Sequence, residues 1–133
     1  MDMKIADEHR TLDRLFATAL KRLEEGAPDL AIADAVEDLR GAMESHLAAE
    51  ENLYFPTIWA LLPDFKGRLR AFIRAHQHFR GLLQEITGLT VSGEQEEATY
   101  VLKKLKHEFG RHEGGEEDAL RALDQEILID EPR

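Results

Sequence analysis

The sequence predicts an all-α protein, an antiparallel up-down-up-down four-helix bundle, on the strength of two observations. Apolar residues recur at spacings of three and four almost throughout the chain, whereas the alternation typical of strands is not sustained. Short segments with glycine and proline divide this pattern into four stretches, and short loops between amphipathic helices favour antiparallel packing. The same pattern leaves open a longer helical hairpin that pairs with a second copy in a dimer.

The first helix is expected over about residues 3–25, where Leu12, Phe16 and Leu20 fall on one face. The segment Gly26-Ala27-Pro28 then ends it. Glycine adopts the left-handed conformation that closes many helices, and proline often follows such an end.

The second helix is expected over about residues 30–62, with a kink at Pro56. A proline inside a helix removes a backbone donor and clashes with the preceding turn. Trp59, which follows the kink, is expected in the core. The apolar stripe before the kink consists of Val36, Leu39, Met43, Leu47 and Leu53.

The third helix is expected over about residues 64–87 and the fourth over about 94–125, separated by a loop at residues 87–93 with the sequence TGLTVSG. The fourth helix is weakened by roughly 1 kcal/mol per glycine relative to alanine. It therefore either breaks or is held by close backbone approach or a bound ligand at these glycines, which are Gly110, Gly114 and Gly115.

Composition excludes several classes of site and partner. The length fits a single domain, expected over residues 1–133. The chain has 17 Lys and Arg against 27 Asp and Glu, and the net charge of -10 argues against nucleic acid and anionic membranes as partners. It contains no cysteine, which excludes disulfides, thiolate zinc sites and iron–sulfur clusters. Neither a signal-peptide core nor a membrane-length apolar run is present, so we expect a cytoplasmic protein.

The histidines divide into two groups by their position on the predicted helices. His78 and His107 lie away from the apolar faces and are expected to face solvent. Successive residues of a helix are rotated by about 100°, and by this count each helix has one histidine on the same face as its core residues. The four histidines expected to point into the core are His9, His46, His76 and His112.

Carboxylates accompany two of these histidines at a spacing of one helical turn. Glu50 follows His46 by four residues, and Glu116 follows His112 by four residues. The strings HLAAEE and HEGGEE that contain them resemble each other, and EHRTLDRLF more weakly resembles AHQHFRGLL. The chain therefore predicts two helical hairpins related by a pseudo-twofold axis.

A pair of bridged metal ions explains why carboxylates and imidazoles gather in an apolar core. A buried carboxylate without a partner costs several kcal/mol or becomes protonated. Two divalent ions supply the missing positive charge. Imidazole suits iron, zinc, copper and nickel, and carboxylates favour harder ions such as iron and manganese, so zinc or manganese is possible as well as iron. Glu51 and Glu117 lie beside the apolar faces, where a solvated or ligand-supporting role is expected.

These residues resemble the hemerythrin-like, or HHE cation-binding, family over nearly the whole chain. The resemblance rests on EHRTL at 8–12, HLAAEENLYFP at 46–56, AHQHFR at 75–80 and HEGGEE at 112–117. It implies a non-haem centre of two iron ions with an oxo or hydroxo bridge, in which Glu50 and Glu116 are the bridging carboxylates. The ligands that it implies are His9, His46, Glu50, His76, His112 and Glu116.

Three further residues are expected beside the ligands. Arg80 stands where the oxygen-carrying hemerythrins have a fifth histidine, and an arginine does not bind a metal, which argues against reversible oxygen carriage. Asp13 and Arg80 each lie one turn beyond a ligand histidine, where they could pair with each other or orient it. Tyr54 lies one turn beyond Glu50, where its hydroxyl could donate to a ligand bound at the metals.

Two classes of function follow from this set of residues, with a metal-free or zinc-filled structural bundle as a third alternative. The first is a binding or sensing protein whose di-iron centre takes up oxygen, nitric oxide, peroxide or iron itself. The second is a di-iron redox enzyme, or a protein that repairs iron centres, acting on oxygen, peroxide or nitric oxide. Binding or sensing is favoured, because no general acid or base is evident in the core beyond the ligands.

Overall fold

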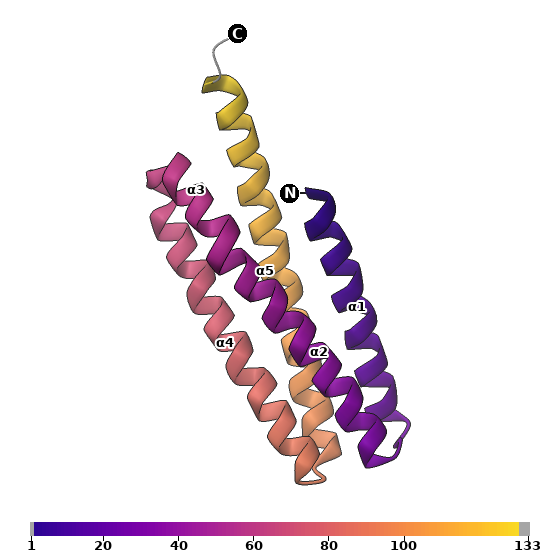
Figure 1. Ribbon diagram of the computed structural model, residues 1–133. Coiled ribbons are helices and arrows are strands. Elements are labelled where there is room, and N and C mark those ends of the chain that lie inside the picture. The colour runs from indigo at the N-terminus through magenta and orange to yellow at the C-terminus, as the bar shows by residue number, and fades with distance from the viewer. Residues whose placement is uncertain (1, 131–133) are drawn as a thin grey trace.

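The computed structural model describes the backbone of residues 2–130 and the side chains of residues 7–119 and 121. Within this part of the chain every regular element is helical, which confirms the predicted all-α bundle (Figure 1). The four long helices are α1 (Asp2–Glu24), α2 (Asp29–Ala49), α4 (Lys66–Val91) and α5 (Gln95–Asp130). Between α2 and α4 lie a π-helical segment (Glu50–Tyr54), the short helix α3 (Phe55–Leu61) and a 3₁₀ turn (Pro63–Phe65).

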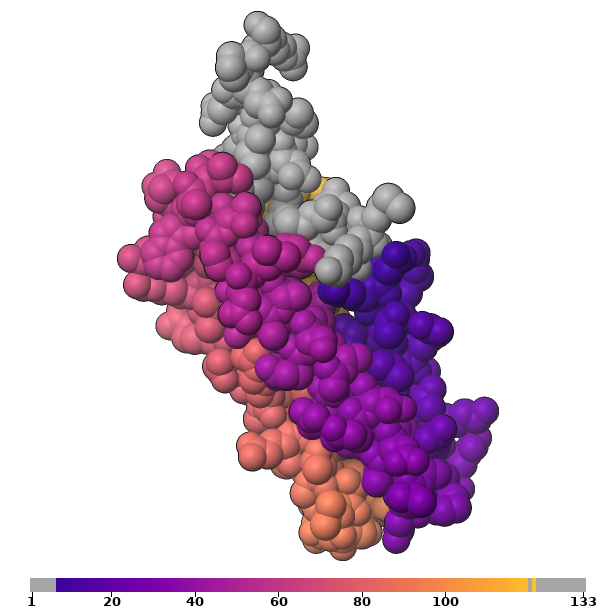
Figure 2. Space-filling view, in the orientation of Figure 1, coloured from indigo at the N-terminus to yellow at the C-terminus, as the bar shows by residue number. Residues whose placement is uncertain are grey.

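Each long helix packs against two others, so that the order around the bundle is α1, α2, α4 and α5. Figure 1 shows the α1–α2 and α4–α5 turns at one end of the bundle and α3 at the other. Consecutive long helices therefore run in opposite directions. In the space-filling view, the side chains of α1 and α2 meet along the half of the bundle that carries the turns (Figure 2).

Glycines with a positive φ close both hairpin turns. Gly26 has φ 65° and Gly93 has φ 77°, a conformation that side chains with a Cβ rarely adopt. The N–H of the residue after each glycine donates to a carbonyl inside the helix, Arg22 at 3.0 Å in α1 and Leu89 at 2.9 Å in α4. This pattern is the Schellman motif, which satisfies carbonyls that the end of a helix leaves free.

The loop predicted at residues 87–93 is mostly helical instead, because α4 continues to Val91. Two threonines of this segment donate their hydroxyls to carbonyls of the same helix, Thr87 to Leu83 at 3.0 Å and Thr90 to Thr87 at 2.8 Å. These bonds satisfy the hydroxyls without ending the helix. The connection to α5 is correspondingly short.

The predicted kink at Pro56 takes the form of a π-helical turn just before the proline. The N–H of Phe55 donates to the carbonyl of Glu50, five residues earlier. The wider turn makes room for the proline ring, which would clash with a carbonyl four residues earlier in a regular α-helix. Pro56 then occupies the first turn of α3, where its missing N–H costs no hydrogen bond.

The π-helical turn also changes which side chains are buried. It contains one more residue than an α-turn, so the apolar stripe of α2 does not continue in register. Leu53, predicted in the core, is 57% exposed, and Tyr54 is buried in its place. Trp59 was also expected in the core, but it is 45% exposed and packs under the Lys66 ammonium at 5.1 Å.

The buried apolar residues form two clusters on either side of the inward-facing histidines. The smaller joins α3 to α4 through Phe55, Ile58 and Leu69. The larger fills the bundle between the four long helices toward the turns, and its fully buried members include Leu12, Phe16, Leu39, Met43, Leu102 and Leu105. No helix within the described residues combines the length and apolar composition that crossing a bilayer requires.

Helix α5 continues without a break through its glycines. A Cβ built at Gly114 or Gly115 meets open space, so neither glycine serves a close backbone approach. We therefore predict that Gly114→Ala and Gly115→Ala each raise the free energy of unfolding by about 1 kcal/mol, measured by thermal or denaturant unfolding.

Gly26→Ala is the control for this experiment, because its positive φ makes a Cβ unfavourable and the substitution should lower stability by about 1–2 kcal/mol. A loss of stability in Gly114→Ala would show that the glycine is required for a reason other than backbone conformation.

Candidate metal centre

The six residues predicted as ligands meet in the half of the bundle near α3. The four long helices each provide one histidine, His9 from α1, His46 from α2, His76 from α4 and His112 from α5. Glu50 begins the π-helical segment, and its Oε1 lies 3.0 Å from His46 Nε2 and 3.6 Å from His76 Nε2. Glu50 thus lies between the two hairpins.

The second predicted carboxylate serves the other pair of histidines. Glu116 Oε1 contacts His112 Nε2 and lies 3.2 Å from His76 Nε2. The Nε2 atoms of His76 and His112 are themselves 3.1 Å apart. Two imidazoles and one carboxylate therefore converge on a single point between α4 and α5.

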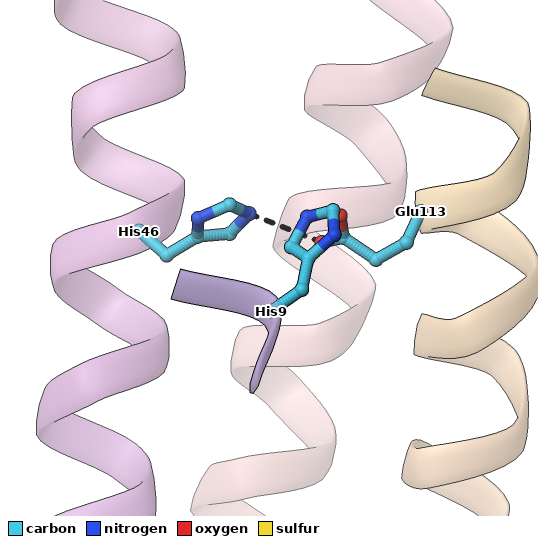
Figure 3. A group of neighbouring side chains, drawn as sticks. All are labelled: His9, His46 and Glu113. Atoms are coloured by element: carbon cyan, nitrogen blue, oxygen red, sulfur yellow. Dashed lines mark hydrogen bonds and ion pairs between the residues drawn. The ribbon is translucent and has the colours of Figure 1, made fainter. Parts of the chain in front are cut away.

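Glu113, which the sequence analysis did not single out, completes the other pair. Its Oε1 lies 3.0 Å from His46 Nε2, and its Oε2 contacts His9 Nε2. Figure 3 shows the three side chains pointing toward one another from α1, α2 and α5. Only 7% of Glu113 is exposed, although it belongs to one of the most acidic segments of the chain.

A second layer of carboxylates faces the outer nitrogens of three histidines. His46 Nδ1 lies 2.6 Å from Glu8, and His76 Nδ1 lies 2.7 Å from Glu51. His9 Nδ1 lies 3.1 Å from Glu117. A carboxylate on Nδ1 holds the ring so that Nε2 faces the centre. Glu51 and Glu117, which were expected to be solvated or to support a ligand, therefore each contact a histidine of the cluster through its outer nitrogen.

The ion pair considered between Asp13 and Arg80 is not formed. The Arg80 guanidinium instead binds two carboxylates, Glu44 of α2 at 2.9 Å and Glu51 of the π-helical segment at 2.9 Å. Asp13 lies exposed on α1, which packs against α2 and α5 rather than α4. Arg80 therefore supports His76 through Glu51, and its own pKa is raised by these two carboxylates.

Tyr54, His78 and His107 are the remaining residues for which the sequence predicted a position. Tyr54 is buried at the end of the π-helical segment, and no hydrogen bond of its hydroxyl is recorded within the described residues, so its contact with a ligand stays a prediction. His78 is exposed and pairs with Glu108 at 2.7 Å, and His107 is also exposed. Both therefore lie outside the cluster, as predicted.

Phenylalanine rings enclose the cluster on two sides. Phe109 and Phe79 lie toward the turns, with ring centroids 6.1 Å from His46 and 5.2 Å from His112, respectively. Toward α3, Phe55 stacks on His76 at 5.6 Å. These apolar walls limit contact with water and strengthen the electrostatic interactions between the charged groups.

The burial of these groups changes their proton affinities. Burial alone would lower the pKa of His46, but the neighbouring carboxylates of Glu113 and Glu50 outweigh it and raise that pKa to about 11. Burial raises the pKa of Glu50 to about 9, with a further contribution from the neighbouring Glu116. The pKa of Glu113 is lowered in spite of its burial, because its carboxylate lies against the imidazoles of His46 and His9. Without a metal, the cluster therefore holds protons in place of cations.

Several buried donor atoms of the cluster lie close to one another without hydrogen-bond geometry among the described residues. Three buried atoms, His9 Nε2, Glu50 Oε1 and Glu113 Oε2, make no hydrogen bond within the described part of the chain, although each faces other polar atoms of the cluster. Atoms that face a common point without hydrogen-bond geometry are arranged as ligands are. Three groups could hold metal ions, namely His9–His46–Glu113, His76–His112–Glu116 and Glu50–Glu113–Glu116.

The sequence contains a signal for Glu113 but not for the role of Glu8. Glu113 lies four residues after Phe109 and three before Glu116, so it belongs to the inward face of its helix. Glu8 directly precedes His9, but it supports a histidine of the neighbouring helix, which helical spacing alone does not predict.

The sequence was compared with known families and proteins. It matches the family described as Hemerythrin HHE cation binding domain over residues 3–123, which includes every residue of the cluster. A search of curated proteins found no match, and a search of solved structures found none either. The inward-facing histidines and glutamates agree with the description of the matched family as cation-binding. The chain therefore belongs to the hemerythrin family of HHE cation-binding domains.

Proposed function

We propose that this protein holds two iron ions between its hairpins and uses them to bind or sense a small ligand such as oxygen, nitric oxide or peroxide, or to sense iron itself. The observation that carries the proposal is the convergence of two histidine pairs with carboxylates that lie on and between them. His9 and His46 would hold one ion, His76 and His112 the other, with Glu50 between the two.

The chemistry of the donors favours iron. Neutral imidazole binds iron, zinc, copper and nickel, whereas carboxylates favour harder ions such as iron and manganese, so a mixed set suits iron. When bound, such a pair of ions supplies positions to which a small molecule can bind and electrons that it can exchange. The protein contributes oriented ligands and apolar walls.

Two surface cavities are lined in part by residues of the centre. One of about 250 Å³ lies between α1 and α5 and is lined by His9, Glu113 and Gly114, among others. Another of about 310 Å³ lies between α1 and α2 beside Glu8 and His46. Each has room for several molecules of the size of water, of which one takes about 30 Å³. Access on this scale fits a diatomic or peroxide ligand.

Arg80 supports a role other than oxygen carriage of the hemerythrin type. Its guanidinium is held between Glu44 and Glu51. In the sequence it stands where the resemblance expects the fifth histidine of the oxygen carriers, and its bonds hold Glu51, which contacts His76.

The first test is elemental analysis of the aerobically purified protein together with its absorption spectrum. We expect about two irons per chain and the near-ultraviolet bands of an oxo-bridged ferric pair, with spectral shifts on addition of nitric oxide or peroxide. Turnover of peroxide or oxygen well above that of free iron would favour the redox enzyme over the sensor. A folded protein that takes up no metal, even on reconstitution, would overturn the proposal.

Metal binding should release protons and become tighter as the pH rises. At pH 7 the metal-free protein keeps a proton on His46, whose pKa is about 11, and on Glu50, whose pKa is about 9. Ligands bind as neutral imidazole and carboxylate, so an ion displaces these protons. Affinity should increase by up to about tenfold per pH unit for each proton released. A titration with cobalt(II) in weak buffer containing an indicator dye measures the release, and a pH-independent affinity without proton release would contradict the assignment.

Glu51 should affect metal affinity through His76. Glu51→Gln weakens the bond to His76 Nδ1, so we expect metal affinity to fall by about 10- to 100-fold, as for other groups that orient a ligand. Competition with a chromophoric chelator measures this change. Glu44→Gln is the matched control, because Glu44 binds the same arginine and has no recorded contact with a histidine among the described residues. Equal affinities for the two variants would show that Glu51 does not orient His76.

A further inference from the structure

Glu113 is a buried carboxylate of the cluster that lies outside the six residues predicted as ligands. Its two oxygens face two different histidines, Oε1 toward His46 Nε2 at 3.0 Å and Oε2 in contact with His9 Nε2 (Figure 3). In this arrangement both oxygens are directed at the inner nitrogens, which are the atoms available to a metal ion.

The relation of Glu113 to its histidines repeats that of Glu116 to the other pair. Glu116 Oε1 faces the Nε2 atoms of His76 and His112. Glu113 precedes Glu116 by three residues on α5, a spacing that keeps both carboxylates on the inward face. One carboxylate of α5 therefore serves each histidine pair, and Glu50 lies between the pairs.

Packing alone does not account for a carboxylate at this position. The pseudo-twofold repeat aligns Glu113 with Leu47, since each directly follows a histidine of the cluster. Leu47 is fully buried, so an apolar side chain occupies the equivalent position in the other hairpin. Glu113 Oε2 is buried against His9 Nε2 and makes no hydrogen bond of normal geometry among the described residues, so its contact there is one of charge.

We propose that Glu113 is a third carboxylate ligand of the centre, bound to the ion held by His9 and His46. This inference rests on the proposed function, because it requires that this pair of histidines binds a metal ion. A third carboxylate adds negative charge and a hard oxygen donor, which favours iron and manganese over zinc. The donor set is then four histidines and three glutamates.

The experiment compares metal binding by the full chain and its variants under anaerobic conditions. Iron(II) and cobalt(II) are the probes, stoichiometry is measured by elemental analysis after gel filtration, and affinity by competition with a chromophoric chelator. The variants are Glu113→Gln, which preserves shape, and Glu113→Leu, which copies the residue in the other hairpin. Circular dichroism establishes that each variant is folded, and the leucine variant gives the answer if the glutamine variant is not.

Two controls separate ligation from weaker effects. Glu117→Gln removes a carboxylate that contacts only the outer nitrogen of His9 among the described histidines, and should cost the 10- to 100-fold typical of an orienting group. Glu108→Gln removes a carboxylate of the same helix that pairs with the exposed His78, and should leave metal binding unchanged.

We expect the unaltered chain to bind two ions, and the Glu113 variants to lose more than about 100-fold in affinity at one position while the other changes little. Two ions bound with unaltered affinity in both variants would overturn the role of Glu113 and leave the proposed function intact. An unaltered chain that binds no metal would overturn the proposed function itself.

A double substitution identifies the affected position. If Glu113 and His9 bind the same ion, Glu113→Gln should cost little further affinity in a His9→Ala background, where that position is already weakened. In a His112→Ala background the position held by His9 and His46 is intact, so Glu113→Gln should lower its metal affinity by the same factor as in the unaltered chain. The reverse pattern would place Glu113 on the ion of the other pair and overturn the assignment.

Discussion

The structure depends on how charge is compensated where carboxylates and imidazoles meet inside an apolar bundle. Glu50, Glu113 and Glu116 are all buried, and burial of an unpaired carboxylate costs several kcal/mol. Each faces imidazole nitrogens, yet three polar atoms of the cluster remain without a hydrogen bond among the described residues. Since two apolar clusters lie on either side of this layer, the packing of the whole bundle requires these charges to be balanced.

The pseudo-twofold relation of the hairpins organises this balance, and the departures from it make the halves unequal. Glu51 of one hairpin supports His76 of the other, and Glu117 supports His9 in the reverse direction. The repeat breaks at Glu113, where the other hairpin has leucine, and at Glu8, where it has alanine. Both extra carboxylates lie beside His46, whereas the half that contains His76 has Arg80 nearby, so the two halves differ in charge.

Helical periodicity was sufficient to predict the four helices and the four inward-facing histidines, because both depend on local spacing. It was not sufficient at Pro56, because the π-helical turn before the proline shifts the register of the apolar stripe, which exposes Leu53 and buries Tyr54. Helical periodicity also does not predict contacts between helices, and Arg80 pairs with Glu44 and Glu51 rather than with Asp13. The spacing of four residues after a histidine, which identifies Glu50 and Glu116, does not identify Glu113, because Glu113 directly follows His112.

The position of the two tight turns has a consequence for the order of folding. Both lie at the end of the bundle away from the cluster, and each joins two helices that are adjacent in sequence. Contacts within a hairpin are local and form quickly, whereas pairing the hairpins requires closure of a longer segment through α3. Each hairpin is therefore expected to bring its own two histidines together early, and the cluster is complete only once the two hairpins have paired through the α1–α5 and α2–α4 contacts.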